Sequence, residues 1–473
     1  MQVLLMVLVL SIFIHDTLVA PETIAPSSML MLTAVLLPKV LWVSAYTLIC
    51  RWAYRHLDGT LGPARVLSRL DRFTTMFRLG VAGLYLVDLC LGALVYIRAQ
   101  TRNPVLIDEV AVISPTLVLF CIGLLVYYPI ERRLREASLI HRFDQGLPVY
   151  PIKGRWSYVI THLRHEAALI LIPLLLVMAW VEVVPDSWLV WKLDLAPILI
   201  FVGAAVIFLF APTIIRYIWD TKPLPDGAIR QRLMAMCHTY RVQVRDVLLW
   251  QTTSGGMINA AVMGLIRPLR YILLSDGLLD QLPQKQVEAV MAHELAHVCR
   301  RHMFWLLAVA LTTLGLMMLL AFPVVYFGSP NGVPNPAATG FVVIGATEQK
   351  ARSVLAIGGA LAIWAVVFGW VSRRVERQAD TFAVQHLARQ RNLDTIDAEA
   401  VQTMVGALQQ VADLNHMHTG RRNWRHGSIV WRQNHLRTLV GQLVERPEID
   451  RLMNRIKLVT LAGMVVLGAT FYF

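Results

Sequence analysis

The chain has 473 residues, of which 56% are hydrophobic and 16% are charged. Globular proteins average roughly 45–50% and 25%, and the mean hydropathy of +0.55 departs in the same direction. This composition argues against an ordinary soluble fold. The net charge of +13 is not collected into one basic stripe that alternates with aromatic residues, which argues against nucleic-acid binding.

Long apolar stretches lie along most of the chain, and a membrane-spanning helix needs roughly 20 such residues. They are residues 3–20, 29–50, 79–97, 109–129, 167–184, 195–217, 304–327, 353–371 and 457–473. The first and the last are the shortest, so we expect about eight to nine spanning helices. The first lacks a basic leader and a small-residue cleavage site, so we interpret it as an anchor.

Basic residues gather in two of the turns between these segments, 51–78 and 131–165, while the intervening turns are nearly free of them. This alternation is the positive-inside pattern of membrane proteins. It predicts that residues 218–303 and 372–456 face the cytoplasm, and we expect the membrane to be a bacterial inner membrane. The five cysteines show no CxxC spacing, so no disulfide framework is expected.

The first largely polar region begins near residue 218. An amphipathic helix is expected from Arg230 to Tyr240, and the helical spacing of apolar residues after Pro283 predicts a second helix. Between them, β-branched and apolar runs predict three short strands, at residues 247–251, 257–263 and 271–274.

The second of these helices carries an HExxH pattern formed by His293, Glu294 and His297. Histidines four residues apart lie on one helix face and can bind one zinc ion. Glu294 beside them can take a proton from a zinc-bound water, whose pKa the metal lowers to about 7. So short a pattern occurs by chance in roughly one chain of this length in a hundred. The alternative is therefore that these residues form an ordinary solvated helix end.

A catalytic zinc ion takes three protein ligands and keeps an open position, and two histidines with a glutamate are one known set. Glu376 is the expected third ligand, so we expect one Zn²⁺ per chain. Asp380 lies one turn further along the same helix and is expected to accept a hydrogen bond from the outer nitrogen of His293. The alternative is that this charged run is only an interfacial anchor beside a membrane segment.

Three sequence blocks in this region resemble the membrane-bound gluzincin metallopeptidases, the family that includes the HtpX heat-shock protease and the type I CAAX prenyl protease. They are AHELAH at 292–297, ERQAD at 376–380, which is similar to the ExxAD of that family, and NAAVMG at 259–264, which is similar to its NAxxxG strand. The blocks occur in the order of the family, with an apolar hairpin between the ligand segments. The resemblance covers residues 225–445 and does not extend to the six N-terminal segments.

A fourth block, HGSIVWR from His426 to Arg432, is similar to the HPxxxxR of the family, with Gly427 where proline is usual. The resemblance implies that His426 and Arg432 bind substrate or stabilise the oxyanion, as cationic and hydrogen-bonding groups can. The alternative is a generally basic surface. The strand with Asn259 and Ala260 is expected to pair with an extended substrate peptide.

Three other polar residues invite a structural interpretation. His302 follows His297 by five residues, which rotates it off the ligand face of a continuous helix, so we expect an interfacial residue. Lys39 and Asp88 lie near the centres of two apolar segments. Since intramembrane charges are paired or functional, we expect an ion pair between antiparallel helices.

These expectations combine into a mostly α-helical integral membrane protein with a cytoplasmic, zincin-like α+β metalloprotease domain that a membrane hairpin interrupts. The expected parts are an N-terminal bundle of six segments (1–217), the first catalytic part (218–303), the hairpin (304–371), the second catalytic part (372–456) and a last segment (457–473).

The expected activity is zinc-dependent hydrolysis of membrane-associated polypeptides, in membrane-protein quality control. One alternative is CAAX-type processing of lipidated or anchored proteins. The other is a transporter or receptor with a structural metal site, although a structural zinc site typically has four protein ligands and needs no base. Expected partners are polypeptide substrates and the lipid bilayer, with no nucleic acid. The sequence leaves the oligomeric state and the cleavage specificity open.

Overall fold

The structure is a computed structural model, and it describes most of the chain. The described residues are 28–57, 63–90, 105–144, 151–152, 154–184, 195–219, 221–251, 258–326, 342–415, 417–445 and 447–472. The expected segment 3–20 lies outside them. The chain divides into two compact units, with the boundary between Thr221 and Lys222.

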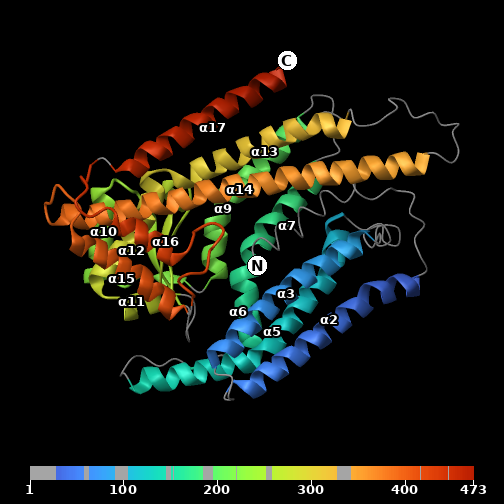
Figure 1. The fold of residues 1–473 in the computed structure, drawn as a ribbon, viewed down its shortest axis with the longest axis horizontal. Helices are drawn as coiled ribbons and strands as arrows, with labels where there is room; N and C mark the ends of the chain where they lie inside the picture. Colours follow the sequence, from blue (N-terminus) through green and yellow to red (C-terminus); the bar gives the residue numbers. More distant parts are fainter. Residues whose placement is uncertain are drawn as a thin grey trace. The chain divides into compact units, whose positions relative to one another are not determined.

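Apart from Thr221, which begins strand β1 (Thr221–Pro223), the secondary structure described in the first unit is helical. It contains α2 (Ser28–His56), α3 (Pro63–Cys90), α5 (Val105–Asp144), α6 (Arg155–His162), the π-helix η1 (Leu163–Ala167), α7 (Ala168–Val183) and α9 (Ala196–Ile218). Helices α2, α3 and α5 pack against one another, and α7 packs against α9 (Figure 1). Apolar runs of this length form helices because a helix satisfies every backbone polar group internally, as a bilayer requires.

Lys39 and Asp88 form a buried ion pair between α2 and α3, with Lys39 Nζ 2.5 Å from Asp88 Oδ2. Only 4% and 3% of the two residues are exposed. Tyr46 on α2 lies 3.0 Å from Thr74 on α3. Compared with the Lys39–Asp88 contact, this second contact lies further along α2 and earlier along α3. The helices therefore run antiparallel, and the predicted ion pair is confirmed.

Replacing either partner of this pair alone leaves a buried charge without its counterion. We expect Lys39→Met and Asp88→Asn each to lower stability by about 3–5 kcal/mol. The double substitution should be less destabilising than the sum of the two. Thermal unfolding of the detergent-purified protein measures the cycle, and strict additivity of the two losses would contradict coupling.

The second unit contains a small mixed sheet with helices packed on it. Its strands are β1 (Thr221–Pro223), β2 (Asp246–Trp250), β3 (Ala260–Met263) and β4 (Tyr271–Ser275), in the order β1-β2-β4-β3. Strand β2 is parallel to β4, and β3 is antiparallel to β4 with Ala260 opposite Leu274. The three predicted strands are thus present, and β3 is an edge strand.

The helices of the second unit bring together residues that are far apart in the sequence. They are α10 (Ala228–Thr239), η2 (Arg267–Leu269), α11 (Asp276–Gln281), α12 (Gln284–Cys299), α13 (His302–Tyr326), α14 (Val342–Gln390), α15 (Ala398–Leu414), α16 (Ile429–Arg437) and α17 (Glu448–Tyr472). Helix α12 packs on β3, α14 and α15. The apolar positions Val287, Met291 and Leu295 of α12 are buried in this core, as their spacing predicted.

Helix α14 is continuous over 49 residues, from the apolar stretch into the polar region that carries Glu376. No glycine or proline follows Gly369 within it, so nothing interrupts its hydrogen bonds. Helices α13 and α14 lie side by side, and α17 packs on both (Figure 1). The expected end of the hairpin at residue 371 is therefore not a structural break.

Five helices among the described residues are long and apolar enough to cross a membrane. They are Leu32–His56, Val110–Ala137, Ile198–Ile218, His302–Ala321 and Glu448–Thr470. The expected segment 167–184 corresponds to a shorter apolar helix, Leu171–Val183. The segments 79–97 and 353–371 fall in α3 and α14 where they are described, and neither meets the same criteria. The protein is accordingly a multi-pass, mostly helical membrane protein.

Candidate metal centre

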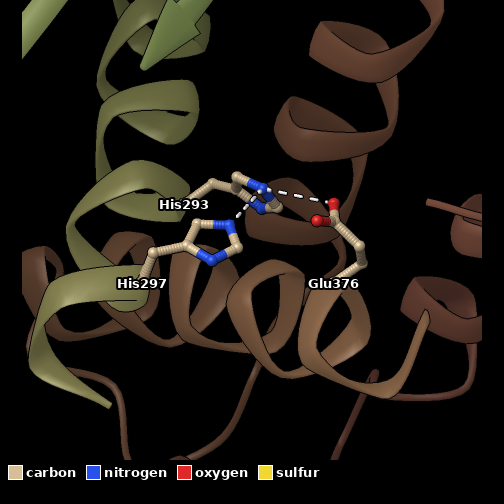
Figure 2. Close-up of side chains that lie close together, drawn as sticks. All are labelled: His293, His297 and Glu376. Atoms are coloured by element: carbon tan, nitrogen blue, oxygen red, sulfur yellow. Dashed lines mark hydrogen bonds and ion pairs between the residues drawn. The ribbon is translucent and has the colours of Figure 1, made fainter. Parts of the chain in front are cut away.

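Three expected ligands converge from two helices. Figure 2 shows His293 and His297 pointing from α12 toward Glu376 on α14. His293 Nε2 lies 3.3 Å from His297 Nε2 and 3.7 Å from Glu376 Oε2. One ligand atom from each residue lies within 4.8 Å of the others. A single ion can therefore be reached by all three.

Asp380 and Arg432 form a buried layer behind His293. Asp380 Oδ1 lies 2.9 Å from His293 Nδ1, the atom that faces away from Glu376. Arg432 donates from Nε and Nη2 to the two oxygens of Asp380, at 2.8 and 2.6 Å. Burial opposes ionisation, but Arg432 outweighs it and lowers the pKa of Asp380 to about 2. Asp380 is thus a carboxylate, and it favours the His293 tautomer with the proton on Nδ1.

Glu376 is held as an anion by two cationic or hydrogen-bonding residues. His426 Nδ1 lies 2.9 Å from Glu376 Oε1, and Arg432 Nη1 lies 3.4 Å from Oε2. Burial would raise the pKa of Glu376, but the hydrogen bond from His426 and the charge of Arg432 outweigh it and hold the pKa well below its usual range. An ionised carboxylate is the form that binds a metal.

Gly427 explains how His426 reaches this position. Its φ of +77° lies in the left-handed region, whereas proline is fixed near −65°. Gly427 and Asn423 exchange backbone hydrogen bonds of 3.0 and 3.2 Å, which close a tight turn around His426. Proline could not form this turn, because it can neither adopt this φ nor donate a backbone hydrogen bond. The turn is therefore specific to the departure from the family pattern at Gly427.

Glu294 lies beside the ligands on α12, partly buried, and faces the edge strand. Burial raises the pKa of Glu294 to about 7, with a backbone hydrogen bond from Val262 of β3 opposing the rise. A carboxylate with a pKa near neutrality suits proton transfer, because it can both accept and release a proton. Glu294 is placed where it can exchange protons beside the three ligands.

Asn259 and Ala260 begin the edge strand. Asn259 is exposed, and its Oδ1 accepts a hydrogen bond from the Ala260 backbone at 3.0 Å. Ala260 is buried against the core. Among the described residues β3 pairs only with β4, and α12, the helix that carries His293 and His297, packs on this strand.

Gly264 ends this strand in a conformation that other residues adopt with difficulty. Its φ is +95°, and a Cβ atom would lie 2.1 Å from Leu269 O. Gly264→Ala should therefore destabilise the protein by more than the roughly 1–2 kcal/mol of a left-handed backbone alone. Gly441 is the matched control, because its φ is +81° but its Cβ would meet nothing within 4 Å. Equal losses of thermal stability in Gly264→Ala and Gly441→Ala would contradict the steric argument.

His302 lies against the proposed ligand His297 and is not an interfacial residue. It is only 1% exposed, and its Nδ1 lies 3.0 Å from His297 Nδ1. The expectation of an interfacial residue was wrong because it assumed a continuous helix. Helix α12 ends at Cys299, and Arg301 has a φ of 55° before α13 begins. This break turns His302 back toward His297.

The donor set and its surroundings fit zinc. Zinc binds histidine nitrogen and carboxylate oxygen at about 2.0–2.2 Å, so tetrahedral ligands lie roughly 3.3–3.6 Å apart. The 3.3 and 3.7 Å separations at His293 are of this size. Burial and the neighbouring His293 hold the pKa of His297 well below its usual range, so it is the neutral imidazole that a metal requires. Three protein ligands leave a fourth position open.

Comparisons with known proteins show what this region is similar to. Residues 226–440 match peptidase family M48. A protease HtpX homolog from Acaryochloris marina is 29% identical over 192 residues, or 38% of this chain and 61% of the relative. Protease HtpX from Xanthomonas oryzae pv. oryzae is 28% identical over 165 residues, or 34% of this chain and 49% of the relative. The chain thus spans about half to three-fifths of the length of these relatives.

The fold has a solved counterpart. The crystal structure of S. mikatae Ste24p matches 87% of this chain and 100% of its own chain, with a TM-score of 0.50 and 14% sequence identity. At this identity the likeness concerns the fold alone. The match of residues 226–440 to peptidase family M48 confirms the family resemblance of the sequence blocks.

Proposed function

We propose that this protein is a zinc-dependent metalloendopeptidase of the membrane. The observation that carries the proposal is the convergence of His293, His297 and Glu376, with Glu294 beside them on the same helix. The match of residues 226–440 to peptidase family M48 supports it. A structural zinc site, as in the transporter or receptor alternative, would typically use four protein ligands and no neighbouring base.

Glu294 is the proposed general base and acid. When bound, zinc would supply Lewis-acid polarisation of water and of the scissile carbonyl. Glu294 takes a proton from the attacking water and returns it to the amine that leaves, so the carboxylate is regenerated at the end of the cycle. Its place on α12 beside His293 and His297 suits both transfers.

His426 and Arg432 take different proposed roles. His426 has 49% of its side chain exposed while its Nδ1 faces Glu376, so its other ring nitrogen is available to a carbonyl oxygen that gains negative charge. Arg432 has only 9% exposed, and it pairs with Asp380 and Glu376. Arg432 therefore orients the ligand carboxylate and the partner of His293, and substrate contact falls to His426.

The edge strand β3 is the proposed substrate-binding element, with Asn259 and Ala260 at its start. An extended peptide can add to an exposed sheet edge through backbone hydrogen bonds. Such pairing is independent of side-chain sequence, so broad endopeptidase specificity follows. Val262 on this strand contacts Glu294, and this contact supports the proposal that a peptide added to the strand would lie near the proposed base.

The position of the centre supports membrane-associated substrates. His297 precedes the apolar helix His302–Ala321 by five residues, and Glu376 lies on the helix that continues the apolar segment 353–371. We therefore propose that polypeptides at the membrane surface reach the metal, in quality control of membrane proteins. The charge pattern supports a cytoplasmic orientation, and we keep a bacterial inner membrane as the proposed location.

The test uses the full-length, detergent-purified protein. We expect about one zinc per chain, cleavage of casein and of an unfolded membrane protein, loss of cleavage after removal of zinc by a chelator, and recovery on zinc addition. His293→Ala should lose both zinc and cleavage. Zinc-loaded protein that cleaves neither substrate would reject the endopeptidase. Cleavage of a prenylated C-terminal peptide alone would favour the CAAX-type alternative.

A further inference from the structure

We propose that Asp450, on the first turn of the C-terminal apolar helix α17, fixes the tautomer of the metal ligand His297 through Gln378 and His302. The inference rests on the proposed metal centre and extends it to a helix that contributes no ligand. Each step follows from which atoms can donate a proton and which can only accept one.

The first step joins α17 to α14. Gln378 Nε2 donates to Asp450 Oδ1 at 2.5 Å, and Arg300 Nη2 donates to Asp450 Oδ2 at 2.9 Å. A carboxylate paired with a guanidinium accepts hydrogen bonds only, so it must face the amide nitrogen of Gln378. The amide oxygen of Gln378 therefore points the opposite way, toward His302.

The second step joins α14 to α13. His302 Nε2 lies 2.9 Å from Gln378 Oε1. An amide oxygen cannot donate, so the proton of this hydrogen bond belongs to His302 Nε2. In a neutral imidazole the other nitrogen is then an acceptor, and His302 Nδ1 carries a lone pair.

The third step reaches the metal centre. His302 Nδ1 lies 3.0 Å from His297 Nδ1. Since His302 Nδ1 accepts, the proton lies on His297 Nδ1, and His297 Nε2 keeps the lone pair that faces His293 Nε2 and the ligand site. A partner that accepts from the outer nitrogen of a ligating histidine fixes its ring orientation and raises its basicity.

The two histidine ligands are thus supported in different ways. His293 faces the carboxylate of Asp380 directly, whereas His297 faces a neutral relay of two buried side chains, His302 (1% exposed) and Gln378 (3% exposed). The relay starts where Arg300, at the end of α12, pairs with α17. Displacement of α17 would consequently release the orientation of one ligand and leave the other unchanged.

The experiment measures zinc affinity of the full-length protein by competition with a chromophoric chelator. We expect His302→Phe and Gln378→Leu each to weaken zinc binding by about 10–100-fold. Asp450→Asn should weaken it in the wild-type background and have no further effect in Gln378→Leu, because the relay is already interrupted there. The Gln378→Leu variant keeps the test open if His302→Phe fails to fold.

His386→Phe is the matched control. His386 is also a buried histidine on α14. Its Nδ1 lies 2.8 Å from the hydroxyl of Tyr240, and it does not contact the ligands. It should lose thermal stability and keep wild-type zinc affinity. The relay is overturned if His302→Phe and Gln378→Leu bind zinc within twofold of wild type, or if His386→Phe weakens binding equally. In either case a wild type that binds zinc and cleaves casein leaves the proposed function intact, whereas a wild type without zinc rejects both.

Discussion

Glu294→Gln is expected to lower kcat/KM for peptide hydrolysis by about 10²–10⁴-fold while zinc content stays at the wild-type level. Glutamine has the shape of glutamate but cannot take the proton of the attacking water. Zinc should be retained because the ligand atoms belong to His293, His297 and Glu376. Cleavage of a quenched fluorescent casein and metal analysis of the same preparation provide the two measurements.

Glu288→Gln is the control for this substitution. Glu288 lies on the same helix and is 8% exposed. It forms an ion pair with Arg232, with 2.9 Å between the two side chains, and it does not face the metal ligands. It should keep nearly full activity. If Glu294→Gln retained zinc and cleaved at the wild-type rate, Glu294 would not be the base and the proposed mechanism would fail.

Arg432→Met is expected to lower the free energy of unfolding by about 3–5 kcal/mol, because it leaves the buried carboxylates of Asp380 and Glu376 without their shared cation. Asp380 is 0% exposed and Glu376 is 6% exposed, so water cannot replace the guanidinium. Lysine should not restore stability, because it cannot reproduce the two parallel hydrogen bonds to Asp380. Denaturant unfolding in detergent at pH 7 measures the loss.

The pH dependence of stability provides a second signature. Because the folded pKa of Asp380 is lowered from 3.8 to about 2, its contribution is complete above about pH 4 and is lost as the pH falls toward 2. Without Arg432, burial raises this pKa, so acid unfolding of Arg432→Met should begin at higher pH. Arg437→Met on the same helix is the control, since exposed Arg437 bonds only to Asn434 among the described residues. An unchanged acid profile would argue against the buried pair.

Local sequence patterns were enough to predict the helices and strands that carry the site. The spacing of His293 and His297 follows from the helical period, and apolar spacing identified the buried face of α12. The pairing of Lys39 with Asp88 could be predicted because an intramembrane charge requires a partner and few exist. The extent of α14 could not be predicted, because the sequence changes from apolar to charged near Ser372 without a helix-breaking residue.

The sequence by itself determined the make-up of the proposed centre: which residue types lie at ligand spacing, and that a carboxylate lies beside them. The sequence also predicted Asp380 behind His293, whereas only the tertiary structure decided what lies behind His297 and Glu376. His302, Gln378 and Asp450 come from three different helices, and a single backbone break at Arg301 brings the first of them to His297. Arg432 likewise acquires its role from contacts 52 residues away in sequence. Ligand spacing is a property of one helix, whereas the hydrogen bonds that orient ligands depend on how several helices pack.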